Sequence, residues 1–418
     1  MQVNTIVILN DYNYINGGIA QVAITSANAL AARGLRVIYF SAAEDPSRPP
    51  ALSAAVENHS TGHADLLTHT STLGAMRQGL WNKHAVVQLK AVLEKLDPST
   101  TVIHLHSWTK ALSSSIGRAI IHSGFTAIYT LHDYFIACPN GGFYNYQKSK
   151  ICHLKPMSLA CICTNCDVRN YGHKLWRVAR QAIQSRIGEL PSGIRYYFSV
   201  TKFSENILRP FLPPDSEIFL LNSPVTYSLP GRPRNHANSN KMLFAGRVSA
   251  EKGAAIACEA ARIAGVPLII VGEGPEKPSL QERYPEVLFK GWLSVQDVFT
   301  EMLEARALLF PSVCYETQGL TVLEALSVGL PVIVSDECAA SEFVDKQNGF
   351  TFRSGDAGEL AARIKAITED SAKAEQMSKY AYDKYWHAPY LLDGYIQETL
   401  NIYNQILEKD RSRIWSQQ

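Results

Sequence analysis

The sequence lacks any long hydrophobic run. No window of its 418 residues holds the ~18 uninterrupted apolar residues that a transmembrane helix needs. The opening stretch, MQVNTIVILNDYNY, also lacks the basic segment and long apolar core of a secretory signal, since its apolar run is only IVIL. We therefore expect a cytoplasmic protein without a transmembrane helix.

An excess of one charge is missing as well. The 40 Lys and Arg residues nearly balance the 38 Asp and Glu residues, so the formal net charge is only +2. This balance argues against a partner made of nucleic acid and against an acidic disordered chain. The length and the 46% content of hydrophobic residues predict two or three globular domains.

What the sequence does contain is two series of alternating strands and helices. In the first half, the strand candidates are TIVILN, RVIYFSA, TVIHLHS and TAIYTLHDY, and an Ala-rich helix follows the first of them. Pro, Gly, Asn and basic residues without an apolar period mark a linker over residues 229–240. In the second half, the strand candidates are MLFAGRV, PLIIVGEG, VLFKGWL, RALLFPSV and PVIVSD. The pattern predicts an α/β fold.

Two cations lie in the loop after the first strand of the second half. Arg247 and Lys252 belong to the stretch AGRVSAEKG. Loops at the carboxyl ends of parallel strands bind ligands in doubly wound folds, and a guanidinium together with an ammonium suits a diphosphate. On this motif alone, two solvated surface charges are an equally good interpretation.

Two carboxylates are eight residues apart in YETQGLTVLEALSVGLPVIVSD. Glu316 lies in a loop, and Glu324 lies two turns into a helix that we expect to begin near Thr321. Gly319, Leu320 and Thr321 offer backbone N–H groups at the N-terminus of that helix, where anions bind. A carboxylate beside such a site accepts hydrogen bonds from sugar or ribose hydroxyls, whereas an isolated Glu pair would simply face solvent.

The frame around these carboxylates resembles the E-x7-E signature of retaining glycosyltransferases with the GT-B fold, the group 1 type also called glycosyltransferase family 4. The stretches AGRVSAEKG, VGEGPEK and FKGWL follow in the order of that family. The first half matches more loosely, through NGGIAQVA, HLHS and TLHD. The resemblance implies two Rossmann-like domains that face each other across a cleft, with a C-terminal helix that crosses back to the first domain.

The resemblance also implies domain bounds and residue roles. The segments are an acceptor-side domain over 1–228, the linker, a nucleotide-sugar domain over 241–384 and a crossover helix over 385–418. The residues placed at the donor are Gly17, Gly18, Arg247, Lys252, Gly291, Trp292, Leu293, Gly319, Leu320, Thr321 and Glu324. The candidate catalytic residues are His132, Glu316, Arg247 and Lys252. Arg247 and Lys252 would stabilise the leaving diphosphate, so no catalytic metal is expected.

Other residues of the first half have less definite roles. Asp133, next to His132, is expected to cap a turn and not to act as a nucleophile. His104 and His106 share one face of a strand, with His106 nearer to the cleft, and we expect no metal there.

The implied function is the retaining transfer of a sugar from a nucleotide-diphosphate sugar to a glycan or lipid-linked glycan in bacterial surface polysaccharide synthesis. UDP-sugars are the favoured donors, and GDP-mannose is next. A GT-B nucleotide-sugar epimerase is one alternative, and a non-catalytic, zinc-bearing, glycan-binding scaffold is another. The intact set Arg247, Lys252, Glu316 and Glu324 argues against the scaffold.

Five of the eight cysteines fall within residues 138–166. They are Cys138, Cys152, Cys161, Cys163 and Cys166. The Cys163-x2-Cys166 spacing is typical of zinc ligands, and a metal would supply folding energy to a loop with little core. The stretch also resembles one in bacterial polysaccharide-assembly glycosyltransferases. A structural zinc is the favoured interpretation, and an iron–sulfur cluster, disulfides and buried thiols are the alternatives.

Residues 171–187 combine basic side chains with apolar ones at helical spacing. A basic amphipathic helix of this kind binds anionic membrane surfaces, which would make the protein peripheral at the inner membrane. A core-facing helix with a solvated basic face fits the same pattern equally well.

Overall fold

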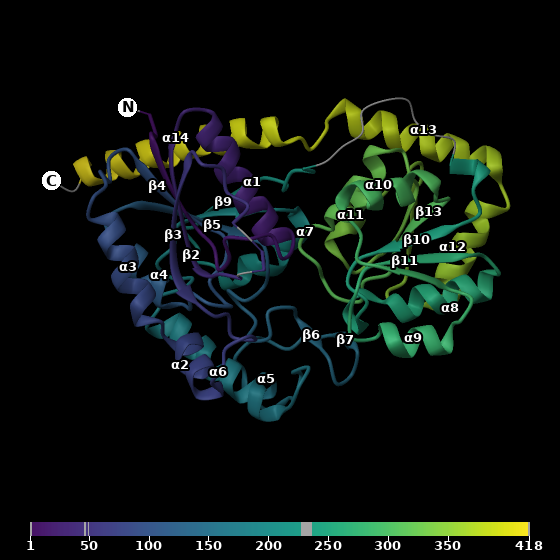
Figure 1. Cartoon of the computed structure of the whole chain (residues 1–418), viewed down its shortest axis with the longest axis horizontal. Helices are drawn as coiled ribbons and strands as arrows, with labels where there is room; N and C mark the ends of the chain where they lie inside the picture. Colours follow the sequence, from purple (N-terminus) through teal and green to yellow (C-terminus); the bar gives the residue numbers. More distant parts are fainter. Residues whose placement is uncertain (1, 46, 49, 227–235, 417–418) are drawn as a thin grey trace. The chain divides into compact units, whose positions relative to one another are not determined.

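The computed structural model describes residues 2–45, 47–48, 50–226 and 236–416. The chain forms two compact units (Figure 1). Unit 1 comprises Met1–Gly141, Leu154–Pro224 and Leu391–Gln418, and unit 2 comprises Gly142–His153 and Val225–Tyr390. Most of the predicted linker over 229–240 lies outside the described residues.

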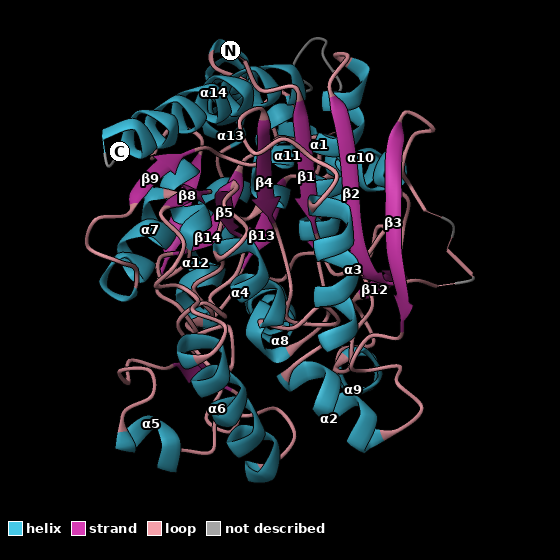
Figure 2. Ribbon diagram, turned by 90° about the vertical axis from the view of Figure 1, so that its left-hand side faces the viewer, coloured by secondary structure: helices cyan, strands magenta, loops and turns pink. Residues whose placement is uncertain are grey.

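Unit 1 is built on a seven-stranded parallel sheet (Figure 2). Most of its strands are apolar runs such as TIVIL, buried on both faces as a parallel sheet covered by helices requires. In spatial order the strands are β3 (Val56–His63), β2 (Arg36–Ala43), β1 (Thr5–Leu9), β4 (Thr101–Leu105), β5 (Thr126–Leu131), β8 (Tyr196–Ser199) and β9 (Glu217–Leu220). The edge strand β3 has no apolar pattern that would predict it, since Val56 is the single buried residue of VENHSTGH and four others are exposed.

Unit 1 also contains eight α-helices among its described residues. They are α1 (Gly18–Ala32), α2 (Thr72–Leu80), α3 (Lys83–Leu93), α4 (Ser115–Ile121), α5 (Leu159–Cys163), α6 (Tyr171–Arg186), α7 (Lys202–Leu208) and α14 (Leu392–Ser416). Tyr395, Tyr403 and Ile406 of α14 are buried in the same core as Ile6 and Ile8 of β1. The C-terminal helix therefore returns to unit 1, where it packs on α1 (Figure 1).

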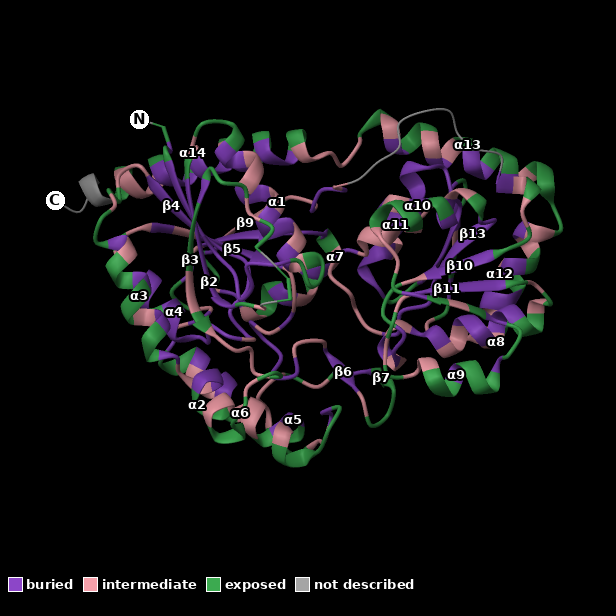
Figure 3. Cartoon of the chain, in the orientation of Figure 1, coloured by how far each residue is buried: buried purple, intermediate pink, exposed green. Residues whose placement is uncertain are grey.

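Unit 2 is built on a six-stranded parallel sheet. In spatial order its strands are β12 (Leu288–Gly291), β11 (Leu268–Val271), β10 (Met242–Ala245), β13 (Ala307–Phe310), β14 (Val332–Ser335) and β15 (Gly349–Phe352). Its helices are α8 (Ala254–Ala264), α9 (Lys277–Arg283), α10 (Val295–Glu304), α11 (Leu320–Ser327), α12 (Ala357–Thr368) and α13 (Ser371–His387). Figure 3 shows the strands at the centre of each sheet buried between helices that expose one side. The prediction of two Rossmann-like domains is confirmed.

The strand order places a topological switch point in each sheet. In unit 1, β1 lies between β2 and β4, and in unit 2, β10 lies between β11 and β13. Chain connections run in opposite directions from such a strand, which leaves a crevice at the carboxyl ends where ligands bind. The loops after β10 and β13 carry the cationic and acidic motifs, and the loops after β4 and β5 carry the histidines.

Residues 142–153 belong to unit 2, although the sequence analysis assigned them to the first domain. They form an antiparallel hairpin of β6 (Tyr144–Asn145) and β7 (Lys150–Ile151). The ring of Phe143 lies 6.0 Å from that of Tyr315, and Nδ1 of His153 lies 3.3 Å from the Tyr315 hydroxyl. The middle of the cysteine-rich stretch therefore contacts the residue that precedes Glu316.

Among the residues that the structure describes, no helix has the length and apolarity of a membrane crossing.

Candidate functional site

The loops after β10 and β13 are joined at their backbones. The N–H of Val313 donates to the carbonyl of Glu251 at 3.0 Å. Gly253 has φ 71, and a Cβ at this position would lie only 2.0 Å from the carbonyl oxygen of Pro311. Only glycine permits so close an approach in the left-handed region. The two loops are therefore held together, and they bring Lys252 to Glu316.

Lys252 and Glu316 form an ion pair. Nζ of Lys252 donates to Oε1 of Glu316 at 2.6 Å, and the Ser312 hydroxyl donates to the same oxygen at 2.7 Å. Burial alone would raise the pKa of Glu316, but the Lys252 charge and these hydrogen bonds hold it below its usual value. Burial alone would lower the pKa of Lys252, and Glu316 raises it instead. Glu316 also has φ 49, a strained conformation for a residue other than glycine.

Arg247 pairs with Glu251, a partner that the sequence analysis missed. The Arg247 side chain remains 60% exposed, so its guanidinium is accessible to an anion. The stretch AGRVSAEKG gave no clear signal for this pair, because residues four apart are neighbours on a helix and Arg247 lies in a loop.

The helix predicted near Thr321 is α11, which begins at Leu320. Gly319 precedes it with φ 83, and a Cβ there would lie 2.6 Å from Cβ of Ala340. The N-terminus of α11, where helices bind anions, therefore follows directly on a tightly packed glycine. Glu324 lies further along the helix, where burial raises its pKa to about 7. An un-ionised or partly ionised carboxyl at neutral pH is consistent with a group that waits for hydrogen-bond donors.

A cavity of about 400 Å³ collects most of the predicted donor residues in unit 2. It is lined by Ala245, Gly246, Arg247, Val271, Gly272, Glu273, Trp292, Leu293, Val298, Thr321 and Glu324. The indole of Trp292 is 76% exposed and so offers a face for stacking. Gly291 precedes it with φ 73, and a Cβ there would lie 2.8 Å from Oε1 of Glu273. The cavity thus combines a cation, a carboxyl, a helix N-terminus and an aromatic ring.

In unit 1, the candidate residue His132 follows β5 and pairs with His106. Nδ1 of His106 lies 2.9 Å from Nε2 of His132, and burial lowers the pKa of His132 to about 3. Burial also lowers the pKa of His106, so both rings are neutral at pH 7. One proton therefore lies between them.

The position of that proton follows from the other nitrogen of His106. Its Nε2 is buried and has no hydrogen-bond partner among the described residues. An unpaired buried N–H is less favourable than an unpaired lone pair, so His106 carries its proton on Nδ1 and donates to His132. His132 then carries its own proton on Nδ1. His104, deeper in the sheet, contacts the Tyr403 hydroxyl at 2.5 Å and the Thr130 hydroxyl at 2.6 Å.

The remaining predicted residues of unit 1 are Gly17 and Gly18, which begin α1 after β1. Gly17 is extended, with φ 164, and a Cβ there would meet nothing within 4 Å. Neither its conformation nor its packing therefore requires glycine. Asp133 accepts a hydrogen bond from the N–H of Phe135 at 2.9 Å, a turn-capping contact, and burial raises its pKa to about 6.

The five cysteines of the insertion do not form the predicted zinc site. Cys152 belongs to unit 2, whereas the other four belong to unit 1. Among the described residues, no three His, Cys, Asp or Glu side chains are arranged to hold a metal ion. Instead, Nζ of the buried Lys174 lies 3.5 Å from Sγ of Cys161 and 3.3 Å from Sγ of Cys166. A lysine ammonium between two thiols takes the place that a metal would need, so these residues do not fit zinc.

The helix expected over 171–187 is α6, but its inward face differs from the expected one. The helix buries Lys174, Arg180, Gln181 and Gln184, whereas Leu175 remains 43% exposed. The buried polar groups have hydrogen-bond partners. The guanidinium of Arg180 donates to the backbone carbonyl of Thr109 at 3.2 Å, and the side-chain amide of Gln181 donates to the backbone carbonyl of Ile136 at 3.1 Å. The interpretation of a core-facing helix with a solvated basic face is therefore wrong for Lys174 and Arg180, which are buried.

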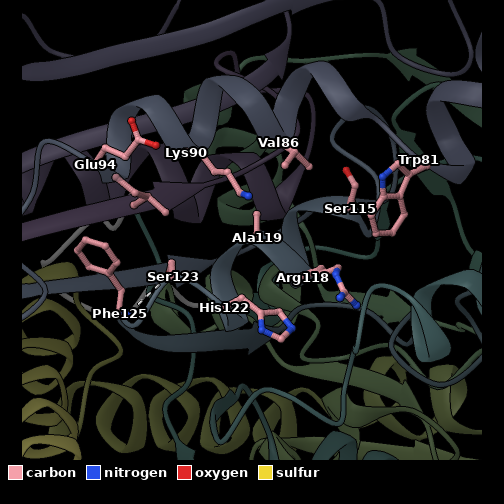
Figure 4. Close-up of a pocket in the computed structure, with 11 residues that line it drawn as sticks. Trp81, Val86, Lys90, Glu94, Ser115, Arg118, Ala119, His122, Ser123 and Phe125 are labelled. Atoms are coloured by element: carbon pink, nitrogen blue, oxygen red, sulfur yellow. Dashed lines mark hydrogen bonds between the residues drawn. The ribbon is translucent and has the colours of Figure 1, made fainter.

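Unit 1 also contains a cavity of about 390 Å³ between α3 and α4 (Figure 4). Its polar side chains include Lys90, Arg118 and His122. Arg118 and His122 are both paired with Glu189. None of the candidate site residues lines this cavity.

Comparisons with known proteins agree with these features. Residues 231–384 match the family described as glycosyl transferases group 1. The chain is 26% identical over 186 residues to O-antigen chain mannosyltransferase C of Escherichia coli, which covers 42% of this chain and 49% of that protein. The chain spans half or less of the length of the first curated relatives that it matches.

Solved structures resemble the chain over nearly its whole length. Sucrose-phosphate synthase from Thermosynechococcus elongatus has a TM-score of 0.71 at 21% identity, over 97% of this chain and 100% of that one. The Anabaena protein HepE in complex with UDP has a TM-score of 0.63 at 17% identity, over 96% of this chain and 99% of that one. At such identities the likeness shows the fold, which is the GT-B arrangement of two Rossmann-like domains.

Proposed function

We propose that this protein is a retaining glycosyltransferase of the glycosyltransferase family 4 type. It transfers a sugar from a nucleotide-diphosphate sugar to a glycan or lipid-linked glycan in bacterial surface polysaccharide synthesis. The observation that carries the proposal is the cavity of unit 2, where Arg247, Thr321 and Glu324 meet at the carboxyl edge of the sheet. A UDP-sugar is the favoured donor, and GDP-mannose is next. HepE, a neighbour in fold, binds UDP, and the E. coli relative is a mannosyltransferase.

Each residue has a proposed role at the donor. Arg247 and Lys252 bind the diphosphate, and the backbone N–H groups of Gly319, Leu320 and Thr321 complete its anion site. Glu324 accepts hydrogen bonds from the ribose hydroxyls. The base lies against Gly291, Trp292 and Leu293. Gly17 and Gly18 of unit 1 approach the phosphates.

In the proposed reaction, the bond between the anomeric carbon and the diphosphate oxygen breaks, and the diphosphate leaves with the electron pair. The acceptor hydroxyl forms the new bond to the same face of the anomeric carbon, and its proton passes to the leaving diphosphate. The developing charge on the diphosphate is stabilised by Arg247, Lys252 and the α11 N-terminus, in place of a catalytic metal. Glu316 contacts the donor sugar, and the neutral His132 donates its Nδ1 proton to a sugar oxygen.

We also propose that the protein acts in the cytoplasm at the surface of the inner membrane, through residues 171–187. Tyr171, Leu175 and Ile187 expose 39%, 43% and 47% of their surface, and Arg186 is exposed as well. Exposed apolar side chains next to a cation suit the boundary between lipid headgroups and acyl chains.

The first test is a thermal-shift panel of UDP, GDP, ADP, dTDP and CMP. A ligand at ~100 times its Kd stabilises the fold by ~2.7 kcal/mol, which is a shift of a few degrees. We expect UDP or GDP alone to raise the Tm. If none of the five does, the donor site and the proposed function are both wrong.

A second measurement tests the transfer itself. The matching nucleotide sugar is incubated with and without glycan acceptors, and the products are followed by proton NMR. Acceptor-dependent release of the nucleoside diphosphate, with an unchanged anomeric configuration in the product, is the expected result. Conversion of the nucleotide sugar to an isomer without release of the nucleotide would instead identify an epimerase.

A further inference from the structure

A second cavity in unit 1, between α2 and α6, concentrates positive charge. Its volume is about 600 Å³, and among its lining residues are the cationic side chains Lys110, Arg169, Arg177 and Arg180. The first turn of α6, from Asn170 to His173, lines it too and adds the positive end of a helix dipole. None of the described residues that line it is acidic. We call this cavity the basic pocket.

The cations of the basic pocket are built into the fold. Arg180 is only 7% exposed and lies over two rings, 4.9 Å from the centroid of Phe135 and 5.2 Å from that of Trp176. Lys110 lies over the same Phe135 ring, with its Nζ 5.8 Å from the ring centroid. Nε of Arg177 contacts Oδ2 of Asp167 at 2.5 Å. Lys110, Arg177 and Arg180 are therefore held by their contacts, whereas Arg169 is exposed at the edge of the pocket.

The charges of the basic pocket are under-compensated. Burial, Arg177 and Arg180 together lower the pKa of Lys110, although Asp11 and Asp133 act in the opposite direction. Burial and Arg177 lower the pKa of Arg180 to about 10, although Asp133, Asp11 and Asp167 act in the opposite direction. Asp11 is already engaged by the Ser107 hydroxyl and by the N–H groups of residues 110–112. An anion in the pocket would relieve this mutual repulsion.

Part of the rim of the basic pocket is apolar. Leu67 is 64% exposed and Met76 is 39% exposed, and both line the cavity. Leu73, one turn before Met76 on α2, is 68% exposed. Exposed apolar side chains beside buried cations fit a ligand that carries a phosphate next to an aliphatic chain, since guanidinium groups bind phosphate oxygens in pairs.

The basic pocket also lies near the candidate histidines. Thr109 and Lys110 follow β4, three and four residues after His106, and Asp133 interacts electrostatically with both Lys110 and Arg180. We propose that the basic pocket binds the phosphate or diphosphate of an amphipathic acceptor, whose aliphatic chain lies along Leu67 and Met76. This assignment rests on the proposed glycosyltransferase function, which it supplies with an acceptor class.

Isothermal titration of the full chain tests the proposal with farnesyl diphosphate as the probe. We expect Lys110→Gln and Arg169→Gln each to weaken its binding tenfold or more, and Lys110→Arg to retain most of it. Lys90→Gln, which removes a cation from the other cavity of unit 1, should change the affinity less than twofold. The Tm of each variant shows that it is folded. Arg169 is exposed, so at least this variant should fold normally.

Other results would overturn the proposal. If the wild-type protein does not bind farnesyl diphosphate, or if the pocket variants bind it as Lys90→Gln does, the pocket is no phosphate site. If inorganic diphosphate binds as tightly as farnesyl diphosphate, the site takes a free anion and not an amphipathic acceptor. If farnesol binds as tightly, the phosphate is not recognised. If Arg247→Ala abolishes binding, the probe occupies unit 2.

The two proposals fail in different ways. Nucleoside diphosphates titrated into the same pocket variants should bind as they do to the wild-type protein, because the donor cavity lies in unit 2. A protein that binds no nucleoside diphosphate but binds farnesyl diphosphate through Lys110 would disprove the transferase function and keep the phosphate site. The reverse result would disprove only the acceptor assignment.

Discussion

The ammonium of Lys252 donates a hydrogen bond of 2.6 Å to the carboxylate of Glu316, across two loops that are 64 residues apart in sequence. The side chains are 28% and 13% exposed, so each charge depends on the other. A diphosphate that binds Lys252 must therefore share this cation with Glu316, and the donor sugar next to it meets a carboxylate that is already fixed in position.

Breaking this pair from one side should destabilise the protein. Lys252→Met leaves Glu316 charged and partly buried, and we expect a loss of ~2–4 kcal/mol in the free energy of unfolding at pH 7. Adding Glu316→Gln should recover part of the loss, which urea unfolding of the single and double variants measures. Lys277→Met is the control, because its partner Glu273 is 57% exposed. Equal losses at both lysines would contradict the interpretation.

Arg247 should matter for diphosphate binding and hardly for stability. Arg247→Ala removes an exposed guanidinium, and we expect the affinity for the preferred nucleoside diphosphate to fall ~10–100-fold, the value of a charge-assisted hydrogen-bond pair. The affinity for the corresponding nucleoside should not change. Arg262→Ala is a matched control, since Arg262 is 58% exposed and also pairs with a glutamate, Glu259. Similar losses in both variants would point to a general charge effect.

The burial of Glu324 should make nucleotide binding pH-dependent. Its pKa of about 7 means that the carboxylate becomes protonated, and loses acceptor capacity for ribose hydroxyls, as the pH falls from 8 to 6. We expect affinity to fall over this interval. Glu324→Gln should bind more weakly at pH 8 and should keep only the dependence that comes from the phosphates. Parallel titration curves for the two proteins would exclude this role of Glu324.

For Glu324, the predicted effect of rising pH on stability is opposite in sign to its effect on nucleotide affinity. Because burial raises the pKa of Glu324, the ionised form is disfavoured in the folded state, so this residue lowers stability as the pH rises from about 4.5 to about 7. Glu324→Gln should therefore unfold at higher urea concentration than the wild-type protein at pH 8 and at a similar one at pH 4.5. A variant that is less stable at pH 8 would contradict the burial of the charge.

The prediction of a donor site in unit 2 was made from local determinants. Apolar strands, the glycines of the turns and the spacing of Glu316 and Glu324 are all read within one or two loops. The partners of these residues were not predicted. Ser312 reaches Glu316 only because the β13 loop turns back on itself at a residue with positive φ.

The features of the first half depend on longer-range contacts, and there the sequence misled. Helical periodicity left residues 171–187 open to two interpretations, a membrane-binding helix or a solvated basic face. It did not indicate that Lys174 is buried, where the thiols of Cys161 and Cys166 accept hydrogen bonds from its ammonium. The cysteine spacing predicted a zinc site. Spacing alone does not show that the ammonium of Lys174 lies between the thiols of Cys161 and Cys166. Likewise, nothing in the residues 142–153 indicates that this hairpin packs on Tyr315 in unit 2.

Gly253 should be intolerant of a side chain. Gly253→Ala places a Cβ 2.0 Å from the Pro311 carbonyl in addition to forcing a left-handed conformation, and we expect a loss of ~3 kcal/mol or more in unfolding free energy. Gly265→Ala separates the two effects, because Gly265 has φ 70 but open space around it. That control should lose only ~1–2 kcal/mol, the value of the conformation alone. Equal losses would show that the loops after β10 and β13 can move apart.

His132 should act on turnover and not on donor binding. It lies in unit 1, and replacing a positioned hydrogen-bonding group at a reacting centre lowers kcat by ~10²-fold or more, so we expect this for His132→Ala with an unchanged affinity for the nucleoside diphosphate. His122→Ala, an exposed histidine of the same unit, is the control.

His106 should act through His132, since it fixes the tautomer of that ring. The amide of His106→Asn can still donate from near the position of Nδ1, whereas His106→Leu cannot, so the Asn variant should retain more of kcat than the Leu variant. Equal losses in the two variants would mean that His106 only fills space, and wild-type turnover in His132→Ala would remove His132 from the site.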